Sequence, residues 1–319
     1  MSNGIQAALN TARAIIDNVE RVIIGKRDVI ELAVIALMSK GHLLIEDAPG
    51  VGKTMLARSL AKSLDCSFKR IQFTPDMLPS DITGVSVYNQ KTGDFEFRPG
   101  PIMAQIVLAD EINRATPKVQ SALLECMEEA QITVEGNTHK MPAPFHILAT
   151  QNPIEYEGTF PLPETQLDRF LLRINIGYPS PSDEVNIMNQ QQYSHPIDKL
   201  KSVASSADLE MLQSAVRDIY VDELVKQYIA AVVGATRNHP SIFLGASPRG
   251  SLSLYRTAQA RALIQGRDHI LPDDVKALAE PVLAHRLIPR LTDSSHDKTG
   301  RAIIAKLLET VPVPGLTAK

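Results

Sequence analysis

The feature that most constrains this chain is a glycine-rich turn, residues 46–54 (EDAPGVGKT), set between an apolar run and a helical pattern. The apolar run covers residues 42–45, and the Ala- and Leu-rich segment 55–61 follows the turn. Glycines in such a turn let backbone N–H groups converge on a polyphosphate at a helix N-terminus, where the helix dipole favours negative charge. Strand, turn and helix in this order are the context that a P-loop requires. The sequence therefore predicts a nucleotide-binding P-loop, against the alternative of a chance Gly-Lys-Thr in a helix-capping loop.

Each position of the predicted P-loop has an expected role. Lys53 would reach the β- and γ-phosphates, and Thr54 would hold Mg²⁺. One residue departs from the general pattern, because Asp47 stands where the first glycine is usual. The residues expected to surround the nucleotide are Pro49, Gly50, Val51, Gly52, Lys53, Thr54 and Met55.

Chain length and composition indicate a two-domain globular protein. The chain has 319 residues, and single hydrophobic cores stop growing near roughly 250–300 residues. A hydrophobic fraction of 44% and a charged fraction of 22% are ordinary for a globular protein. The composition changes at residues 177–182 (GYPSPS), and the pattern beyond them is purely helical. We expect an α/β nucleotide-binding domain over residues 1–178 and an all-α domain over residues 179–319.

Charge, cysteine content and hydropathy narrow the function classes. The formal net charge of -3 gives no general electrostatic reason to expect a nucleic-acid partner. Cys66 and Cys126 are the two cysteines, so a disulfide framework is not expected and a reducing compartment fits. No stretch approaches about 18 consecutive apolar residues, and the N-terminus lacks a signal pattern. We expect a cytoplasmic protein without membrane insertion.

A second chemical feature is the apolar run 105–111, which ends in two acids, Asp110 and Glu111. A buried parallel strand whose carboxyl end faces a ligand crevice explains this pattern. Asp110 would hold Mg²⁺, through water or together with Thr54, and Glu111 would polarise the water that attacks the γ-phosphate. The alternative is a strand that ends in solvent, where acids are common.

Two further segments are expected at the nucleotide. The apolar strand 145–150 is followed by Asn152, whose amide would order the attacking water or touch the γ-phosphate; the alternative is a turn residue. Ile23 and Gly25 precede the first core helix, a place that supplies apolar contacts to adenine in many P-loop motors. An ordinary apolar turn explains these two residues equally well.

Two arginines are candidates for contacting phosphate. Arg169 precedes the last core strand, and a guanidinium delivered to the γ-phosphate, often from a neighbouring subunit, stabilises the charge of the transition state. The alternative is a surface salt bridge with Asp168 or Glu164. Arg249 lies near the start of a helix that opens at Ser247, where it could face the phosphates.

The long interruption at residues 74–101 is predicted to carry structure of its own. Alternating residues at 85–88 and 95–97 flank a Lys-Thr-Gly-Asp turn, which indicates a β-hairpin. Long structured loops inside a compact domain are more often functional than incidental.

These motifs, taken in order, resemble those of the AAA+ ATPases and, within them, the MoxR family. The resemblance covers nearly the whole chain. It rests on the P-loop, on ADEINR at 109–114, on ATQNP at 149–153, on LPETQLDRF at 162–170 and on SPR at 247–249. The family commonly has an acid at the position of Asp47, so this departure fits the resemblance.

The resemblance implies a P-loop AAA+ core with a central parallel sheet, an insertion at residues 74–101, and a helical lid. It also implies hexameric rings with ATP at subunit interfaces. Asn152 would be the polar sensor, Arg169 the arginine finger given to the neighbour's ATP, and Arg249 the lid sensor, acting either in its own subunit or across the interface.

The function implied is that of a chaperone-like motor that matures or activates partner complexes, often alongside proteins with a von Willebrand factor A domain. Our hypothesis is an Mg²⁺-dependent ATPase that couples hydrolysis to remodelling of protein partners. Three alternatives stay open. A nucleotide-gated binding module with little turnover is disfavoured by Glu111, a nucleic-acid motor is disfavoured by the mild acidity, and a metal-chelatase motor subunit could be identified only through its partner.

Overall fold

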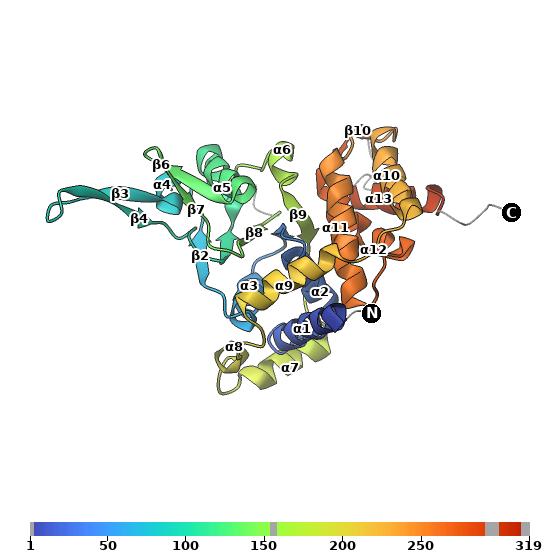
Figure 1. Ribbon diagram of the computed structural model, residues 1–319, viewed down its shortest axis with the longest axis horizontal. Helices are drawn as coiled ribbons and strands as arrows, with labels where there is room; N and C mark the ends of the chain where they lie inside the picture. The colour runs from blue at the N-terminus through green and yellow to red at the C-terminus, as the bar shows by residue number, and fades with distance from the viewer. Residues whose placement is uncertain (1–2, 154–157, 291–299, 314–319) are drawn as a thin grey trace.

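Five parallel strands form the central sheet of the computed structural model, which describes residues 3–153, 158–290 and 300–313 (Figure 1). The strand order is β2-β5-β8-β1-β9, and each neighbouring pair is parallel. The central parallel sheet predicted from the sequence is confirmed. The strands are β1 (His42–Glu46), β2 (Phe68–Gln72), β5 (Ile106–Asp110), β8 (His146–Gln151) and β9 (Phe170–Ile174).

Both faces of this sheet are covered, so its inner strands are apolar on both sides. Successive side chains of a strand point to opposite faces. On β1, Leu43 and Ile45 pack into one buried apolar cluster and Leu44 packs into a second. Helices α1 (Asn3–Glu20), α2 (Arg27–Met38) and α3 (Lys53–Ser63) contribute to the first cluster, and α5 (Pro117–Glu129) contributes to the second.

The interruption between β2 and β5 carries the predicted hairpin. After the short helix α4 (Pro79–Thr83), strands β3 (Gly84–Asn89) and β4 (Asp94–Pro99) pair antiparallel and project from the side of the core (Figure 1). A second antiparallel hairpin, β6 (Gln131–Val134) with β7 (Asn137–Lys140), precedes β8. The predicted hairpin within residues 74–101 is therefore present.

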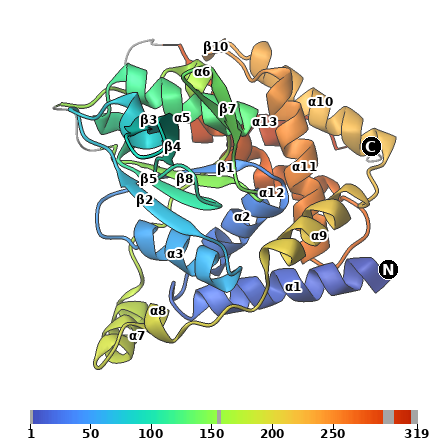
Figure 2. The ribbon, with the colours of Figure 1, turned by 60° about the vertical axis from the view of Figure 1, so that its left-hand side comes forward.

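Helices dominate the chain after β9, as the sequence predicts. Figure 2 shows α9 lying across α1 and α2, and α11 beside α10 and α12. The proposed domain boundary at residue 178 falls in the connection between β9 and α7. The helices are α7 (Pro181–Gln191), α8 (Pro196–Lys199), α9 (Ser206–Arg217), α10 (Glu223–Arg237), α11 (Pro248–Ile264), α12 (Pro272–Leu283) and α13 (Gly300–Thr310).

This lid is not all-α, which corrects one expectation. Two short strands, β10 (Ile242–Leu244) and β11 (Ile288–Pro289), pair antiparallel within it. They are too short to show a period of two along the sequence, and they are separated in the sequence by α11 and α12 and pair only in the fold.

A buried arginine fastens the lid to the start of β9. Arg286, whose side chain is 2% exposed, donates hydrogen bonds to the carbonyl oxygen of Phe170 at 2.8 Å and to Ser253 Oγ at 3.1 Å. It also pairs with the Asp168 carboxylate at 3.1 Å. Burial lowers the pKa of Arg286 to about 10, and Asp168 opposes this shift. The guanidinium is thus charged at neutral pH and holds two segments that are far apart in the sequence.

The cysteines pack as apolar residues. Cys126 is buried and Cys66 half-buried, and neither forms a disulfide. Burial raises the pKa of the Cys66 thiol to about 11 and that of Cys126 to about 12, so both are protonated at neutral pH. Across residues 3–153, 158–290 and 300–313, no helix is long and apolar enough to cross a membrane.

Candidate nucleotide-binding and hydrolysis site

The P-loop joins β1 to α3, as the sequence predicts. Gly50 and Gly52 have positive φ angles of 88° and 96°, a backbone region that costs residues with a Cβ roughly 1–2 kcal/mol. Gly52 is the N-cap of α3, and within the described residues no side chain caps this helix. A Cβ built on Gly52 would have Ile23 Cδ1 as its nearest neighbour, at 3.8 Å. The loop therefore leaves room beside the first N–H groups of a helix, which is the arrangement that binds phosphate.

Lys53 opens α3 and lies back over the loop. Its side chain is buried, and Nζ donates a hydrogen bond to the carbonyl oxygen of Asp47 at 2.5 Å. The ammonium group is thereby held inside the curve of the P-loop. Thr54 and Met55 follow in the first turn of α3, both partly exposed.

The Asp47 side chain ties the P-loop to the end of the core. Its Oδ1 accepts a hydrogen bond from the N–H of Ala48 at 2.9 Å. Its Oδ2 accepts hydrogen bonds from the N–H groups of Ile176 and Gly177, both at 2.7 Å. A glycine could make none of these bonds. The departure from the general P-loop pattern thus has a structural role, because Asp47 joins the loop to the segment that follows β9.

The two residues predicted near adenine, Ile23 and Gly25, have different surroundings. Ile23 is buried and faces Gly52, so it borders the P-loop. Gly25 has a φ of 68°, and a Cβ on it would lie 2.3 Å from Asp183 Oδ2 in α7. A glycine is therefore required at position 25 because α7 approaches it closely, and this holds whether or not Gly25 also contacts adenine.

The donor groups of the P-loop and of Asp110 fit a nucleotide and a hard divalent cation. The loop offers N–H groups and an ammonium to phosphate, while the Thr54 hydroxyl and the Asp110 carboxylate are oxygen ligands of the kind that Mg²⁺ prefers. Within the described part of the chain, no three His, Cys, Asp or Glu side chains gather to hold a metal. Mg²⁺ in proteins usually binds through one or two carboxylates together with phosphates and water.

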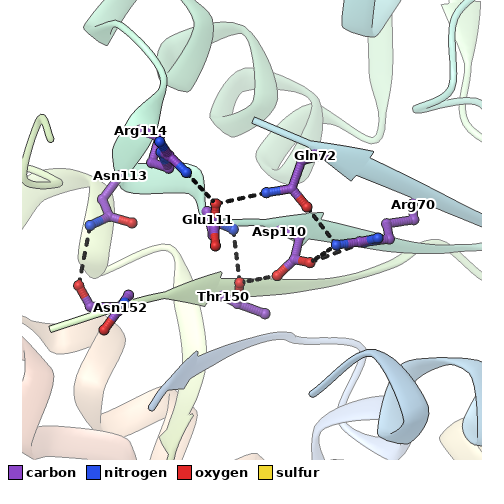
Figure 3. Close-up of polar contacts among 8 residues, drawn as sticks. All are labelled: Arg70, Gln72, Asp110, Glu111, Asn113, Arg114, Thr150 and Asn152. Atoms are coloured by element: carbon purple, nitrogen blue, oxygen red, sulfur yellow. Dashed lines mark hydrogen bonds and ion pairs between the residues drawn. The ribbon is translucent and has the colours of Figure 1, made fainter. Parts of the chain in front are cut away.

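Asp110 is the last residue of β5, and its carboxylate accepts hydrogen bonds from residues of both neighbouring strands (Figure 3). Its Oδ2 accepts hydrogen bonds from Arg70 Nε at 3.0 Å and Nη2 at 2.6 Å. Its Oδ1 accepts a hydrogen bond from Thr150 Oγ1 in β8 at 2.6 Å. The carboxylate is therefore oriented by both strands that neighbour β5.

Glu111 follows Asp110 in a strained conformation. Its φ of 58° and ψ of 49° are left-handed, which costs a residue with a side chain roughly 1–3 kcal/mol and is frequent at functional sites. Its N–H donates to Thr150 Oγ1 at 2.8 Å. Its Oε2 accepts from Gln72 Nε2 at 2.7 Å and from Arg114 Nη1 at 3.1 Å, as Figure 3 shows. The tight turn separates this carboxylate from that of Asp110 although the residues are adjacent.

Asn152 lies just beyond the carboxyl end of β8, the strand between β1 and β5. It is buried, and its carbonyl oxygen accepts a hydrogen bond from Asn113 Nδ2 at 3.4 Å. The P-loop, Asp110, Glu111 and Asn152 thus follow three adjacent strands at one edge of the sheet. We call this edge, with these residues, the P-loop edge.

Arg169 and Arg249 lie at the opposite edge. β9 is parallel to β1, and Arg169 comes just before β9 whereas the P-loop comes just after β1. A strand of five residues spans roughly 16 Å, so Arg169 is at least that far from the P-loop of its own chain. A cavity of about 250 Å³ at this edge is lined by both arginines.

One carboxylate joins the two arginines. Glu128, in the last turn of α5, pairs with Arg169 Nη2 at 3.4 Å and with Arg249 Nη2. Arg169 Nη1 also donates to the carbonyl oxygen of Leu124 at 2.6 Å. The partners considered from the sequence for Arg169 were Asp168 and Glu164, and the structure pairs it with Glu128 instead. We call Glu128, Arg169 and Arg249 the arginine edge.

Buried histidines lie beside the arginine edge. His42, at the start of β1, donates from Nε2 to the carbonyl oxygen of Met127 and accepts at Nδ1 from the N–H of Ile147, both at 3.0 Å. Its ring stacks on His146. Burial lowers the pKa of His42 to about 4, and burial with the nearby His42 lowers that of His146 to about 3. Both rings are therefore neutral at pH 7.

Sequence reasoning missed Arg70, Gln72, Thr150 and Glu128. Alternation along β2 places Arg70 and Gln72 on one face, which is a usable signal. Their contact with the acids depends on β2 pairing with β5, where Gln72 is the register partner of Asp110. Glu128 stands among the acids of α5, a pattern typical of a solvated helix face, and nothing in its local sequence points to an arginine.

Comparisons with known proteins agree with this architecture. The model of the ATPase family associated with various cellular activities (AAA) matches residues 42–172, and an AAA lid domain matches residues 234–307. Uncharacterized protein YeaC of Bacillus subtilis is 52% identical over 299 residues, which are 94% of this chain and 93% of YeaC. Chaperone MoxR1 of Mycobacterium tuberculosis is 40% identical over 326 residues, 99% of this chain and 86% of MoxR1. A crystal structure from Cytophaga hutchinsonii, 38% identical, superposes with a TM-score of 0.91 over 97% of each chain.

The similarity to MoxR1 extends over both the parallel-sheet core and the helical lid. The AAA model matches the core of this chain, and the lid model matches helices that follow it. The chain therefore belongs to the MoxR family of AAA ATPases.

Proposed function

We propose that this protein is an Mg²⁺-dependent ATPase that assembles into rings and uses hydrolysis to remodel protein partners. One observation carries the proposal: the residues that bind the nucleotide and the arginines suited to stabilising its hydrolysis lie at opposite edges of one sheet. A single subunit cannot bring the two sets together. A second copy that places its arginine edge against the P-loop edge of the first completes the site.

At the P-loop edge, each residue has a task that its contacts support. Gly50, Gly52 and Lys53 bind the phosphates, and Asn152 orients the attacking water or the γ-phosphate. Thr54 and Asp110 hold Mg²⁺, which when bound offsets the phosphate charge. Glu111, turned away from Asp110 by its left-handed backbone, accepts the proton of the attacking water.

At the arginine edge, we propose that Arg169 and Arg249 both act on the neighbour's nucleotide. Because Glu128 contacts both guanidiniums, Arg249 lies beside Arg169 and away from the P-loop of its own chain. This favours action across the interface over action within the subunit. Head-to-tail contacts of this kind form a ring when the rotation between subunits closes, and we propose a closed ring of six subunits.

The client role is also a proposal. MoxR1 is named a chaperone, and it is related to this chain over both domains. We infer that the clients are proteins, and that proteins with a von Willebrand factor A domain are among the partners to be tried first. A nucleic-acid motor would instead bind DNA or RNA with a steep dependence on salt.

The proposal is tested by phosphate release from ATP and Mg²⁺ over a range of protein concentrations, with Glu111→Gln as the control. We expect turnover per subunit to rise with concentration, because the site forms between subunits, and to vanish in Glu111→Gln, which still binds ATP. Normal hydrolysis by Glu111→Gln would defeat the assignment of the base. Turnover per subunit that is independent of concentration, in a sample that stays monomeric, would defeat the shared site.

A further inference from the structure

The carboxylate of Glu128 lies between the two guanidiniums of the arginine edge. We propose that Glu128 is a positioning residue that holds Arg169 and Arg249 side by side, so that each subunit presents them to its neighbour as one unit. This inference rests on the proposed function, because the role of the arginines in hydrolysis is itself proposed.

The contacts divide the carboxylate between its two partners. Oε2 faces Arg169 Nη2 at 3.4 Å, and Oε1 faces Arg249 Nη2. Each arginine keeps further N–H groups outside these contacts, because a guanidinium has five. One carboxylate can therefore orient both side chains and leave donors on each for a phosphate.

Electrostatics give a reason for an acid at this position. Glu128 is in the last turn of α5, where the helix dipole disfavours negative charge. Two guanidiniums this close would also repel each other. The carboxylate offsets that repulsion, and the two guanidiniums offset the unfavourable position in the helix. The group of three keeps one net positive charge, which suits a polyphosphate.

The backbone segments that carry the arginines are fixed separately. Ser247 Oγ, at the start of α11, donates to Asp168 Oδ2 at 3.1 Å, and Arg286 donates to Asp168 Oδ1 at 3.1 Å. The first of these bonds joins Asp168, next to Arg169, to Ser247, two residues before Arg249. Glu128 therefore contacts the guanidinium ends of the two arginine side chains, which are the parts that reach a phosphate.

The exposure of the three side chains indicates that Glu128 serves to orient the arginines rather than to stabilise the fold. They are 30% exposed for Arg169, 37% for Glu128 and 52% for Arg249. Ion pairs this open to solvent contribute little to folding. Removing the charge of Glu128 should therefore leave the fold intact and loosen the two guanidiniums.

The first test compares Glu128→Gln with Glu129→Gln. Glu129 is an exposed acid on the same helix and has no ion pair within the described residues. We expect Glu128→Gln to lower kcat roughly tenfold to a hundredfold, as misplaced catalytic groups do, with KM, ATP affinity and chemical unfolding unchanged. Glu129→Gln should match the unmutated protein. Equal kcat in both variants, or a loss of folding in Glu128→Gln, would overturn the inference.

A mixing experiment locates the defect at the interface. Lys53→Ala subunits keep an intact arginine edge, whereas Glu128→Gln subunits keep an intact P-loop edge. We expect mixtures to hydrolyse ATP faster than either variant alone, as mixtures of Lys53→Ala with Arg169→Ala should. Recovery with Arg169→Ala but not with Glu128→Gln would overturn the inference and keep the proposed function. Full turnover by Arg169→Ala alone would instead defeat the proposed function.

Discussion

The two edges of the central sheet are built in different ways. The P-loop edge takes most of its residues from one continuous turn, and its acids and amide end two neighbouring strands. The arginine edge takes its three residues from α5, from the segment before β9 and from the start of α11. Most of the first edge is local in sequence, whereas the whole of the second is assembled by the fold.

This difference separates binding from turnover. On the proposed function, the local loop binds nucleotide within one chain, whereas the arginine edge, which points away from that loop, acts on another chain's nucleotide. Variants in the P-loop itself should therefore change affinity, and variants at the arginine edge should change turnover with affinity preserved.

The largest expected effect is that of Arg169→Ala, which tests whether nucleotide binding and turnover are separated. Arg169→Ala should lower ATP turnover about a thousandfold, the lower range for loss of an arginine finger, and leave nucleotide affinity unchanged. Phosphate release and the binding of a fluorescent ADP analogue measure the two quantities. Weakened binding in a monomeric sample would mean that the arginine edge serves its own nucleotide.

At the other edge, Lys53→Ala should lower nucleotide affinity about a hundredfold, because it removes a charge-assisted contact to phosphate worth roughly 1.5–3 kcal/mol. The exposed Lys118 on α5 supplies a control, and Lys118→Ala should bind as the unmutated protein does. Equilibrium binding titrations decide the outcome. Unchanged affinity in Lys53→Ala would break the assignment of this edge to binding.

Asp47→Ala should lower the free energy of unfolding by about 1.5–3 kcal/mol, since it removes a carboxylate that accepts three backbone hydrogen bonds. Chemical denaturation measures the loss. Asp218→Ala, at an exposed helix end, should stay within about 0.5 kcal/mol of the unmutated protein. An equal effect of the two substitutions would show that the Asp47 contacts do not hold the loop.

Acid should weaken the fold beside the arginine edge. The pKa values of His42 and His146, about 4 and about 3 in the folded state, lie below about 6.5, the usual unfolded value. The unfolded chain therefore binds more protons than the folded chain below pH 6.5. The stability that the neutral histidines allow is fully present above pH 6.5 and falls as the pH drops towards 4. Each histidine contributes a slope of up to about 1.4 kcal/mol per pH unit.

Denaturation curves at several pH values check this slope. His146→Leu should remove one histidine's share of it, compared with the unmutated protein at the same pH values. A stability that is flat from pH 6.5 to pH 4.5 would contradict the prediction.

Much of the fold could be predicted because its signals are local. The runs that form β1, β5 and β8 are apolar and lead into the candidate site residues, and the hairpin at 74–101 has its own turn. The P-loop and the two acids were likewise readable from adjacent positions.

The remainder depends on contacts that only the fold creates. Arg70 reaches Asp110 because β2 pairs with β5, and the sequence does not state that order. The acids around Glu128 on α5 are typical of a solvated helix face, and only the fold brings two arginines from distant segments into contact with it. The β10–β11 pair was missed because strands of two or three residues carry no periodic pattern.

The Asp47 side chain has a further consequence for how quickly the nucleotide binds. It ties the P-loop to residues 176 and 177 through bonds that need no ligand. A loop whose shape is set in advance has no ordering step to complete after an encounter, so the association rate should follow diffusion and steering by charge. The nucleotide's residence time, and not its arrival, is then what the contacts of this loop control.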